Sequence, residues 1–457
     1  MSTPRLSPAR LLAATVAAAT LLLTAGCAPG ANTATTTPGA TSSGTVETDA
    51  SKLGDVTLTV WDQEVRGSQN DEIEALNAAF HEKYPNITIK RNAQSFDDLG
   101  KTLRLALSGS DAPDVVEANN ARSQMGAFVG AGQITSLEPY AEAYGWRDRY
   151  PASVLNLSSY SADAKTFGSG DLYGLPQMGE IVGVYYNKAK LAALGLGVPA
   201  TWAEFNSQLA AVKASGETPL MLGDLEKWPA IHVFGPIQGA HTAADQIQAL
   251  ALGNPGGDWT DATNTAAATE LSDWVKAGYL NEDVNGSKSD DVVAKFGAGT
   301  GAFLLAGSWN TAALDPVMGD NLGFFAPPPA VAGDAPSTTG GTSLPFTITS
   351  ASKNPEAGAA YINFLTTDEA MKVIAETGNL PVLGSAALAP ATGGGKDVYA
   401  AYEQVTTTGN LLPYLDYATP TFSDTLGAAL QDLIAGKQTP AQFTQTLQAD
   451  YGAFVGK

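Results

Sequence analysis

The chain has 457 residues, a formal net charge of −21 and a single cysteine, Cys27. A lone cysteine excludes an internal disulfide, so the fold depends on burying apolar side chains, and the length is sufficient for two domains. An acidic chain without a basic cluster is repelled by phosphate backbones, which excludes nucleic acid as an expected partner.

The first 26 residues have the three parts of a signal peptide. Arg5 and Arg10 precede an apolar run at 11–23, and small residues follow up to Cys27. The run is too short for a good membrane span. Leu23-Thr-Ala-Gly-Cys27 resembles a bacterial lipobox, which implies cleavage after Gly26 and a lipid anchor on Cys27.

Residues 27–55 are predicted to form a flexible tether after the lipidated cysteine. This segment is rich in Thr, Ala, Gly, Ser and Pro and has almost no large apolar residue. It cannot bury enough apolar surface to offset the entropy of ordering. The folded body is therefore expected to begin at Val56.

Strands and helices alternate at the start of the body. Apolar and polar residues alternate at 56–61 and 86–91, and a short segment bounded by Pro113 occupies 114–117, so each is predicted as a strand. Helical spacing occupies 69–84 and the segment after Ser95, whose Ser-Phe-Asp-Asp sequence resembles a capping box. This order predicts βαβ units and a mostly parallel sheet.

The stretch at 171–191 is predicted to cross between two lobes. Gly174 and Pro176 bend the chain, and the β-prone run 181–186 then has the pattern of a buried strand. Asn187 is suited to cap a following helix. A bent entry, a buried strand and a capped exit are typical of a hinge crossing.

The alternation resumes after the crossing. Helices are predicted from Thr201, at 260–277, 355–366 and 368–377, and from 396 to the end, with breaks near 409–413 and 436–440. Strands are predicted at 219–222, 302–306, 322–326 and 343–349. Pro327-Pro-Pro, followed by Gly333 and Pro336, predicts a stiff, exposed connection.

Motifs of the common enzyme classes are missing from the sequence. It has no Gly-x-Ser-x-Gly, no phosphate loop, no His-Glu-x-x-His and no cysteine pair. Asn281-x-Asp-x-Asn-Gly286 resembles the start of a calcium loop, but Val292 stands where the closing acid belongs. We therefore expect no catalytic residues, no metal and no cofactor.

Polar and aromatic residues gather instead at predicted strand ends and helix starts, where open α/β sheets bind ligands. Amide and carboxylate side chains suit sugar hydroxyls, and flat rings suit the apolar face of a sugar. Trp309 is the strongest aromatic candidate, because Gly307-Ser308 places it at a strand end. The candidates are Gln63, Glu64, Asn119, Asn120, Gln177, Glu180, Trp228, His232, Ser308, Trp309, Gly341 and Thr342.

Several segments in order resemble extracellular solute-binding protein family 1, the sugar-capturing lipoproteins of bacterial ABC importers. They span about 56–380 and include Ala112-Pro-Asp-Val-Val, Leu172-Tyr-Gly-Leu-Pro, Val184-Tyr-Tyr-Asn-Lys, Pro199-Ala-Thr-Trp-Ala-Glu-Phe, Gly301-Ala-Phe-Leu-Leu-Ala-Gly-Ser-Trp and Lys353-Asn-Pro-Glu-Ala. The resemblance implies an α/β, periplasmic-binding-protein-like fold of two lobes with a ligand cleft between them.

Mapped onto this chain, the resemblance implies lobe one at 56–178 with 327–380 and lobe two at 179–326 with 381–457. It adds Asn379 to the candidate ligand residues. The implied function is capture of a neutral di- or oligosaccharide, hinge closure and delivery to the permease subunits of an ABC importer at the outer face of the cell membrane. We expect a monomer.

Two alternatives remain open from the sequence. A secreted glycoside hydrolase needs two carboxylates across the sugar bond, and Glu64 and Glu180 are the candidates for that pair. The same fold could instead bind a polyol, a peptide or an ion. Oxyanion sites use arginines, and only Arg66 and Arg122 stand near the candidate strand ends, which favours a neutral ligand.

Overall fold

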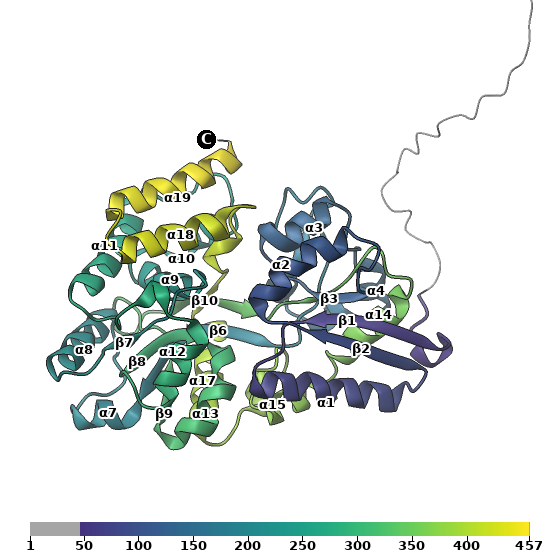
Figure 1. Ribbon diagram of the computed structural model, residues 1–457, viewed down its shortest axis with the longest axis horizontal. Helices are drawn as coiled ribbons and strands as arrows, with labels where there is room; N and C mark the ends of the chain where they lie inside the picture. Colours follow the sequence, from purple (N-terminus) through teal and green to yellow (C-terminus); the bar gives the residue numbers. More distant parts are fainter. Residues whose placement is uncertain (1–45, 457) are drawn as a thin grey trace, which may run out of the picture. The chain divides into compact units, whose positions relative to one another are not determined.

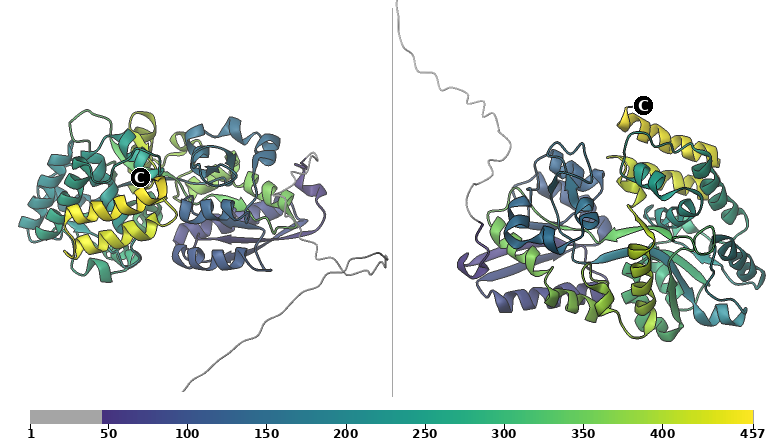
Figure 2. Two further views of the ribbon diagram at one scale, coloured as in Figure 1. Left: turned by 90° about the horizontal axis from the view of Figure 1, so that it is seen from above. Right: turned by 180° about the vertical axis from the view of Figure 1, so that it is seen from behind.

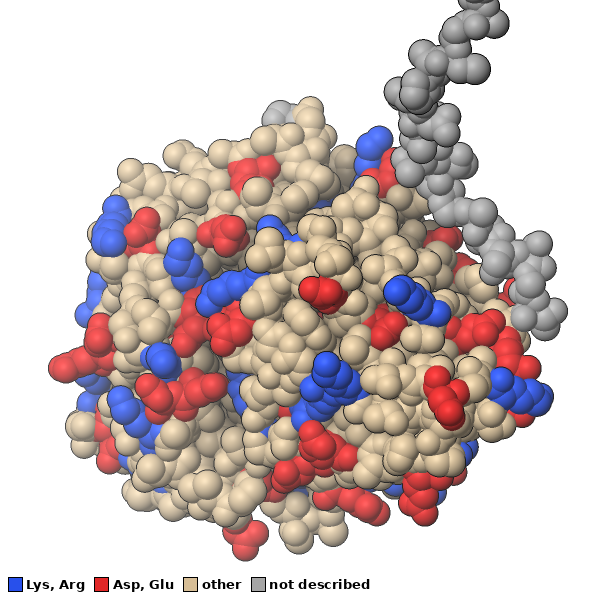
Figure 3. Space-filling view, turned by 45° about the vertical axis from the view of Figure 1, so that its right-hand side comes forward, with Lys and Arg blue, Asp and Glu red and all other residues tan. Residues whose placement is uncertain are grey.

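A computed structural model describes residues 46–456 of the chain (Figures 1 and 2). The predicted leader, Cys27 and most of the predicted tether lie outside the described residues. Within the described range, no helix combines the length and apolarity needed to cross a membrane. Acidic and basic side chains are interspersed over the face in Figure 3, so charge of one sign is not gathered there.

Four strands form the first sheet, in the order β11-β3-β1-β2. β1 (Val56–Asp62) pairs in parallel with β2 (Ile87–Ala93) and β3 (Val115–Glu117), as the βαβ pattern predicted, and β11 (Phe346–Ile348) pairs antiparallel with β3. α1 (Gly67–Lys83) and α2 (Phe96–Leu107) make the crossovers and lie on opposite sides of the strands in Figure 1. Ser95 caps α2 through the Asp98 N–H, at 3.2 Å.

Shorter elements complete this part of the molecule. A five-residue π-helix at Arg122–Gly126 continues directly into α3. α14 and α15 pack with β11, β1 and α1 and return the chain toward the second sheet. The elements are α3 (Ala127–Gly130), α4 (Glu138–Tyr144), α5 (Trp146–Arg149), α6 (Ala152–Leu155), β4 (Ser159–Tyr160), β5 (Asp171–Leu172), α14 (Pro355–Phe364) and α15 (Asp368–Glu376).

The predicted crossing strand is the centre of the second sheet. β6 (Gly179–Asn187) is buried along almost its whole length, and it pairs antiparallel with β8, β9 and β10. Asn187 caps the following helix through the Lys190 N–H, at 3.1 Å, as predicted. The strands around β6 are β7 (Leu220–Met221), β8 (Phe303–Gly307), β9 (Leu322–Phe325), β10 (Ser337–Thr342) and β12 (Asn410–Leu412).

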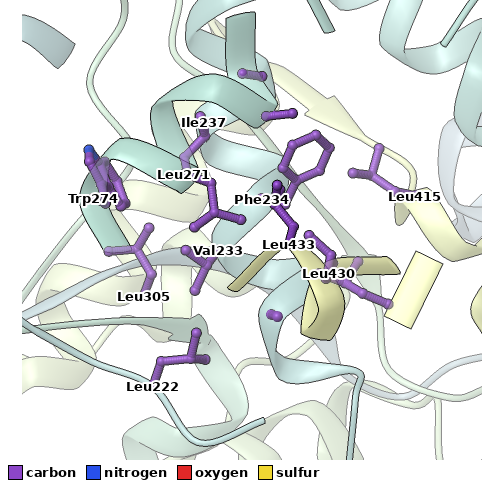
Figure 4. Close-up of a cluster of buried hydrophobic side chains, with 14 of the residues drawn as sticks. Leu222, Val233, Phe234, Ile237, Leu271, Trp274, Leu305, Leu415, Leu430 and Leu433 are labelled. Carbon is purple, nitrogen blue, oxygen red and sulfur yellow. The ribbon is translucent and has the colours of Figure 1, made fainter. Parts of the chain in front are cut away.

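Helices enclose the second sheet over an extensive apolar core (Figure 4). Phe234, Leu271 and Leu430 come from three different helices and are fully buried in one cluster with Leu305 of β8. The helices are α7 (Lys188–Ala193), α8 (Trp202–Ala214), α9 (Pro229–His241), α10 (Ala244–Ala251), α11 (Ala262–Lys276), α12 (Ser289–Gly297), α13 (Thr311–Met318), α16 (Ser385–Leu388), α17 (Gly393–Thr407), α18 (Phe422–Ile434) and α19 (Pro440–Val455).

Helix α9 was missed from the sequence for a local reason. Gly235, Pro236 and Gly239 interrupt its sequence, and residues of this type usually end a helix. Gly235 and Pro236 are buried against the second sheet, and a Cβ on Gly235 would approach Thr339 of β10. Tight packing against the sheet therefore overrides the low helix propensity.

The region after β9 differs most from prediction. A single strand at 343–349 was expected, but the chain forms β10 before it and β11 inside it. Ser-Thr-Thr-Gly-Gly-Thr lacks an apolar pattern, and its stabilisation comes from pairing with β6 and from the Thr338 hydroxyl, which donates to the Val182 carbonyl at 2.8 Å. Pro327, Pro328 and Pro336 are buried, so the connection is exposed only at 330–335 and not, as had been predicted, along its whole length.

The start of the body also lies earlier than predicted. Ala50–Lys52 forms a 3-10 helix, and Ala50 is fully buried in the core of the first sheet. The Asn86 side-chain amide donates to the carbonyls of Ala50 and Gly54 and fixes this segment. Composition could not indicate this contact, because the anchoring residue lies more than thirty positions away.

Three connections run between the two sheets. Residues 173–178 lead into β6, residues 343–345 join β10 to β11, and residues 379–382 follow α15. Isolated bridges link Leu175 to Phe346 and Met178 to Pro381, so the three connections lie side by side. Since β10 pairs with β6, the second connection lies later than residue 327, where the sequence predicted it.

Candidate functional site

A cleft of about 660 Å³, open solvent included, lies where the carboxyl ends of β1 and β3 face the second sheet. Both halves of the molecule contribute side chains to it. They are Gln63, Arg66, Phe96, Asn119, Glu180, Trp228, Ile231, His232, Trp309, Thr342, Leu344, Tyr414, Asp416 and Tyr417. The lining is thus largely aromatic, with amide, hydroxyl and carboxyl groups among the rings.

Gln63, directly after β1, is held in a fixed orientation at the cleft. Its backbone N–H donates to Glu117 Oε2 at 2.7 Å, and its side-chain Nε2 donates to Glu64 Oε1 at 3.2 Å. This bond uses one of the two Nε2 hydrogens, so the amide can still donate through the other and accept through Oε1.

A cluster of buried acids lies behind Gln63. Glu64 and Glu117 are both fully buried, and each carboxyl group accepts a bond from Gln63, at Glu64 Oε1 and at Glu117 Oε2. Burial and neighbouring negative charge raise the pKa of Glu64 to about 7, and the same causes raise the pKa values of Glu117 and Glu72 well above the ordinary value. Asp62 is compensated by Arg91, whose Nε and Nη2 each lie 2.7 Å from a carboxylate oxygen. These acids therefore serve as protonated or paired groups beneath the cleft.

An aromatic wall forms one side of the cleft. Trp228 and His232 stand one turn apart at the start of α9, and Trp309 follows β8. The His232 ring lies 5.6 Å from Trp228 and 5.1 Å from Trp309, edge to face with both. Burial lowers the pKa of His232 to about 3, so its imidazole is neutral at physiological pH. Phe96 approaches Trp228 from the first sheet, at 6.0 Å between centroids.

Glu180 and Tyr414 form the polar pair of the cleft. The Tyr414 hydroxyl donates to Glu180 Oε2 at 3.0 Å, and its ring contacts His232 at 5.3 Å. Burial raises the pKa of Glu180 to about 8, outweighing the opposing effect of the Tyr414 bond. Burial also raises the pKa of Asp416 to about 6. Near neutral pH, the carboxyl groups of Glu180 and Asp416 can therefore either donate or accept a hydrogen bond.

The model of the bacterial extracellular solute-binding protein family matches residues 66–372. The chain belongs to this family. The family consists of proteins that bind solutes outside the cell rather than of enzymes.

Two curated relatives match over most of the chain. A multiple sugar-binding protein of Streptococcus mutans is 25% identical over 314 residues, which are 66% of this chain and 70% of that protein. An uncharacterised ABC transporter extracellular-binding protein of Pyrococcus horikoshii is 24% identical over 296 residues, 63% of this chain and 61% of that protein.

Solved structures show the same fold. A chitin oligosaccharide binding protein superimposes with a TM-score of 0.75 at 24% identity, covering 88% of this chain and all of that one. A solute-binding protein in complex with raffinose gives a TM-score of 0.69 at 20% identity, with 88% and 100% coverage. The predicted two-lobe α/β fold of a periplasmic-type binding protein is therefore confirmed.

In this solute-binding protein, seven of the predicted site residues line the cleft. They come from six separate chain segments, so the fold brings together positions that the sequence left far apart. These residues are Gln63, Asn119, Glu180, Trp228, His232, Trp309 and Thr342.

Of the six predicted site residues that are not among the lining residues, four have partners within the protein. Glu64 is fully buried behind Gln63, and Asn120 donates to the Leu157 carbonyl at 2.7 Å. The Ser308 hydroxyl accepts the Ile181 N–H at 3.2 Å, and the Asn379 amide donates to the Ser68 carbonyl at 3.2 Å.

Of the other two, Gln177 lies in the connection that leads into β6, and Gly341 lies in β10 just before the second connection. Gln177 is fully buried, and neither end of its amide has a partner among the described residues. Gly341 has φ of +136°, and a Cβ there would collide with Leu157, so this position requires glycine for backbone reasons. Neither position lines the cleft, and both lie in or beside the connections between the two sheets.

Seven lining residues were not predicted as site residues. Tyr414, Asp416 and Tyr417 follow β12, near a predicted break in the C-terminal helices. Arg66 carries an ion pair to Asp290 across the cleft, with Nε 3.3 Å from Oδ1. Phe96 belongs to the segment after Ser95 that was predicted only as a helix. The remaining two are Ile231 and Leu344.

The alternatives based on acids receive no support from the geometry. Glu64, one carboxylate of the possible hydrolase pair, does not line the cleft. In the calcium-like segment, the Asn281 carboxamide accepts the Leu222 N–H and Asn285 donates to the Gln431 carbonyl. Among the described residues, no group of three or more His, Cys, Asp or Glu is arranged to hold a metal.

Proposed function

We propose that this protein is the substrate-binding component of a bacterial ABC sugar importer and captures a di- or oligosaccharide of neutral rings in the cleft. The aromatic lining, placed beside Gln63, Asn119 and Glu180, carries the proposal. Rings offer faces to the apolar sides of sugars, while amide and carboxyl groups meet hydroxyls. The names of the sugar-binding relatives support the same ligand class.

Closure around the ligand would follow from contacts on both sides of the cleft. Gln63, Phe96 and Asn119 belong to the half built on the first sheet, and Glu180, Trp228 and Trp309 belong to the other. A ligand touching both sets binds the closed form better than the open form, and that difference drives the equilibrium toward closure. The three adjacent connections would act as the hinge.

The lobes of the proposed binding protein follow the sequence division, 56–178 with 327–380 and 179–326 with 381–457. The pairing of β10 with β6 favours moving the second boundary to about residue 343. We propose that residues 1–26 are removed and that Cys27 carries the lipid anchor at the outer face of the membrane. A monomer docking on the permease subunits, without catalysis of its own, completes the proposal.

Calorimetric titration of residues 46–457 with mono-, di- and oligosaccharides tests this function. Saturable binding of one sugar class, lost when Trp309 is changed to alanine, is the expected result. A response only to polyols, peptides or anions would leave the fold unchanged and refute the sugar assignment. Hydrolysis of a bound glycoside would refute the role as a pure binding protein.

A further inference from the structure

The two tryptophans of the cleft meet at a corner. Their ring centroids lie 6.3 Å apart, and their planes are inclined by 59°. Both rings are half-buried and line the same cavity, so each has exposed area facing the ligand space. One face of Trp309 packs on Gly307, where an added Cβ would overlap the indole, which leaves its other face for a ligand.

Neighbouring aromatic rings hold the two indoles at this angle. His232 contacts both indoles, inclined by 65° to Trp228 and 67° to Trp309, and Tyr414 packs on His232 at 72°. Phe96 meets Trp228 at 68° from the opposite lobe. Neither indole can rotate toward a parallel arrangement without displacing one of these rings, so the angle is a property of the packing.

The angle between two aromatic platforms limits the shape of a disaccharide that covers both. Successive rings of a β-1,4-linked sugar form a nearly flat ribbon, which stacks best on platforms that are close to parallel. In an α-1,4-linked disaccharide, the second ring turns out of the plane of the first. Two indoles inclined by 59° can therefore stack on both rings of the turned disaccharide. Of a flat β-1,4-linked disaccharide, only one ring can stack on an indole.

We propose that this cleft selects a saccharide whose adjacent rings are turned relative to one another, as in α-linked disaccharides, and discriminates against flat β-1,4-linked chains. Trp228 and Trp309 are the specificity-determining residues, and His232 positions them. The proposal rests on the proposed sugar-binding function and narrows its ligand class.

Pairs of disaccharides that differ only at the anomeric centre test the proposal. Maltose against cellobiose, isomaltose against gentiobiose, and melibiose against its β-linked isomer are titrated calorimetrically, together with lactose, xylobiose and glucose. The tightest ligand is expected to be α-linked, with its β partner weaker by about tenfold or more. Tightest binding of a β-1,4-linked sugar, or equal binding of both anomers, would overturn the proposal.

Other outcomes separate this proposal from the function on which it rests. If monosaccharides bind as tightly as disaccharides, the proposed selectivity of the two indoles is refuted while sugar capture stands. Binding of no sugar would refute both.

Variants then locate the selectivity. Trp228→Ala and Trp309→Ala should each weaken the α-linked disaccharide by about tenfold, whereas a monosaccharide should respond strongly to only one of them. His232→Ala should reduce the ratio between anomers, and His232→Phe should restore it by keeping a flat side chain packed against both indoles. Leu105→Ala, at a highly exposed position on α2, is the control, and melting temperatures confirm that each variant is folded.

Discussion

Glu180 should make the stability of this protein depend on pH in a way that Glu180→Gln removes. Burial raises the pKa of Glu180 from its ordinary value of 4.5 to about 8. The folded state therefore holds this proton more tightly than the unfolded state does. The resulting stabilisation is complete below pH 4.5 and is lost as the pH rises through 8.

The size of the effect follows from the two pKa values. At about 1.4 kcal/mol for each pH unit between them, ionising Glu180 at its buried position costs at most about 5 kcal/mol. Glutamine keeps an oxygen that accepts the Tyr414 hydroxyl and has no proton to lose. For a chain of this size, each kcal/mol changes the melting temperature by about 1 °C. Glu180→Gln should therefore match the wild type at pH 4.5 and melt up to about 5 °C higher at pH 8.5.

Differential scanning calorimetry of both proteins at several pH values measures this difference directly. Asp416 and the buried acids behind Gln63 titrate in both proteins, so their effects largely cancel. Glu282→Gln, at an exposed site, is the matched control and should follow the wild type throughout. A constant difference between pH 4.5 and 8.5, or a variant that loses stability relative to the wild type at high pH, would refute the burial argument.

Three further substitutions test individual contacts. Gly307→Ala should lower sugar affinity by about tenfold, measured by titration, because the new methyl group displaces the Trp309 ring. Arg122→Met should lower the free energy of unfolding in urea by about 2 kcal/mol, because the buried guanidinium donates to the Leu252 carbonyl at 3.0 Å. Asn187→Ala should cost about 1 kcal/mol in the same assay, since it removes the cap of α7.

For each of these three substitutions, a specific outcome would contradict the prediction. Gly197→Ala, where an added Cβ meets open space, should leave sugar affinity unchanged. Affinity equal to wild type in Gly307→Ala would mean that the Trp309 ring does not contact the ligand. Unchanged urea midpoints in the Arg122 or Asn187 variants would show that these hydrogen bonds add nothing to stability.

The apolar strands were predictable because the apolar pattern of their own side chains indicates that they are buried. β1 and β8 were predicted within two residues of their observed ends, since each is an uninterrupted or alternating apolar run. β10 was missed because it is Thr- and Gly-rich and is stabilised by β6, more than 150 residues earlier. Local pattern therefore identifies strands that bury their own apolar groups and overlooks those held by partners.

The candidate site shows the same division. Gln63 and Trp309 follow clear strands, so the rule that ligands lie at strand ends was enough to select them. Tyr414 and Asp416 follow a strand of only three residues, and β12 reaches the cleft by pairing with β10, which was itself missed. An error in one pairing thus removed one side of the site from the prediction.

The unpaired polar groups of the cleft bear on why the protein should close only around a ligand. Trp228 Nε1, His232 Nδ1 and Thr342 Oγ1 are buried and have no hydrogen-bond partner among the described residues. A buried polar atom without a partner costs about 1–3 kcal/mol, so several together oppose closure of an empty cleft. A ligand whose hydroxyls bond these atoms removes that cost in the closed form and gains nothing equivalent in the open form, where water already serves them. The same atoms that penalise the empty closed state therefore supply the differential affinity that closure requires.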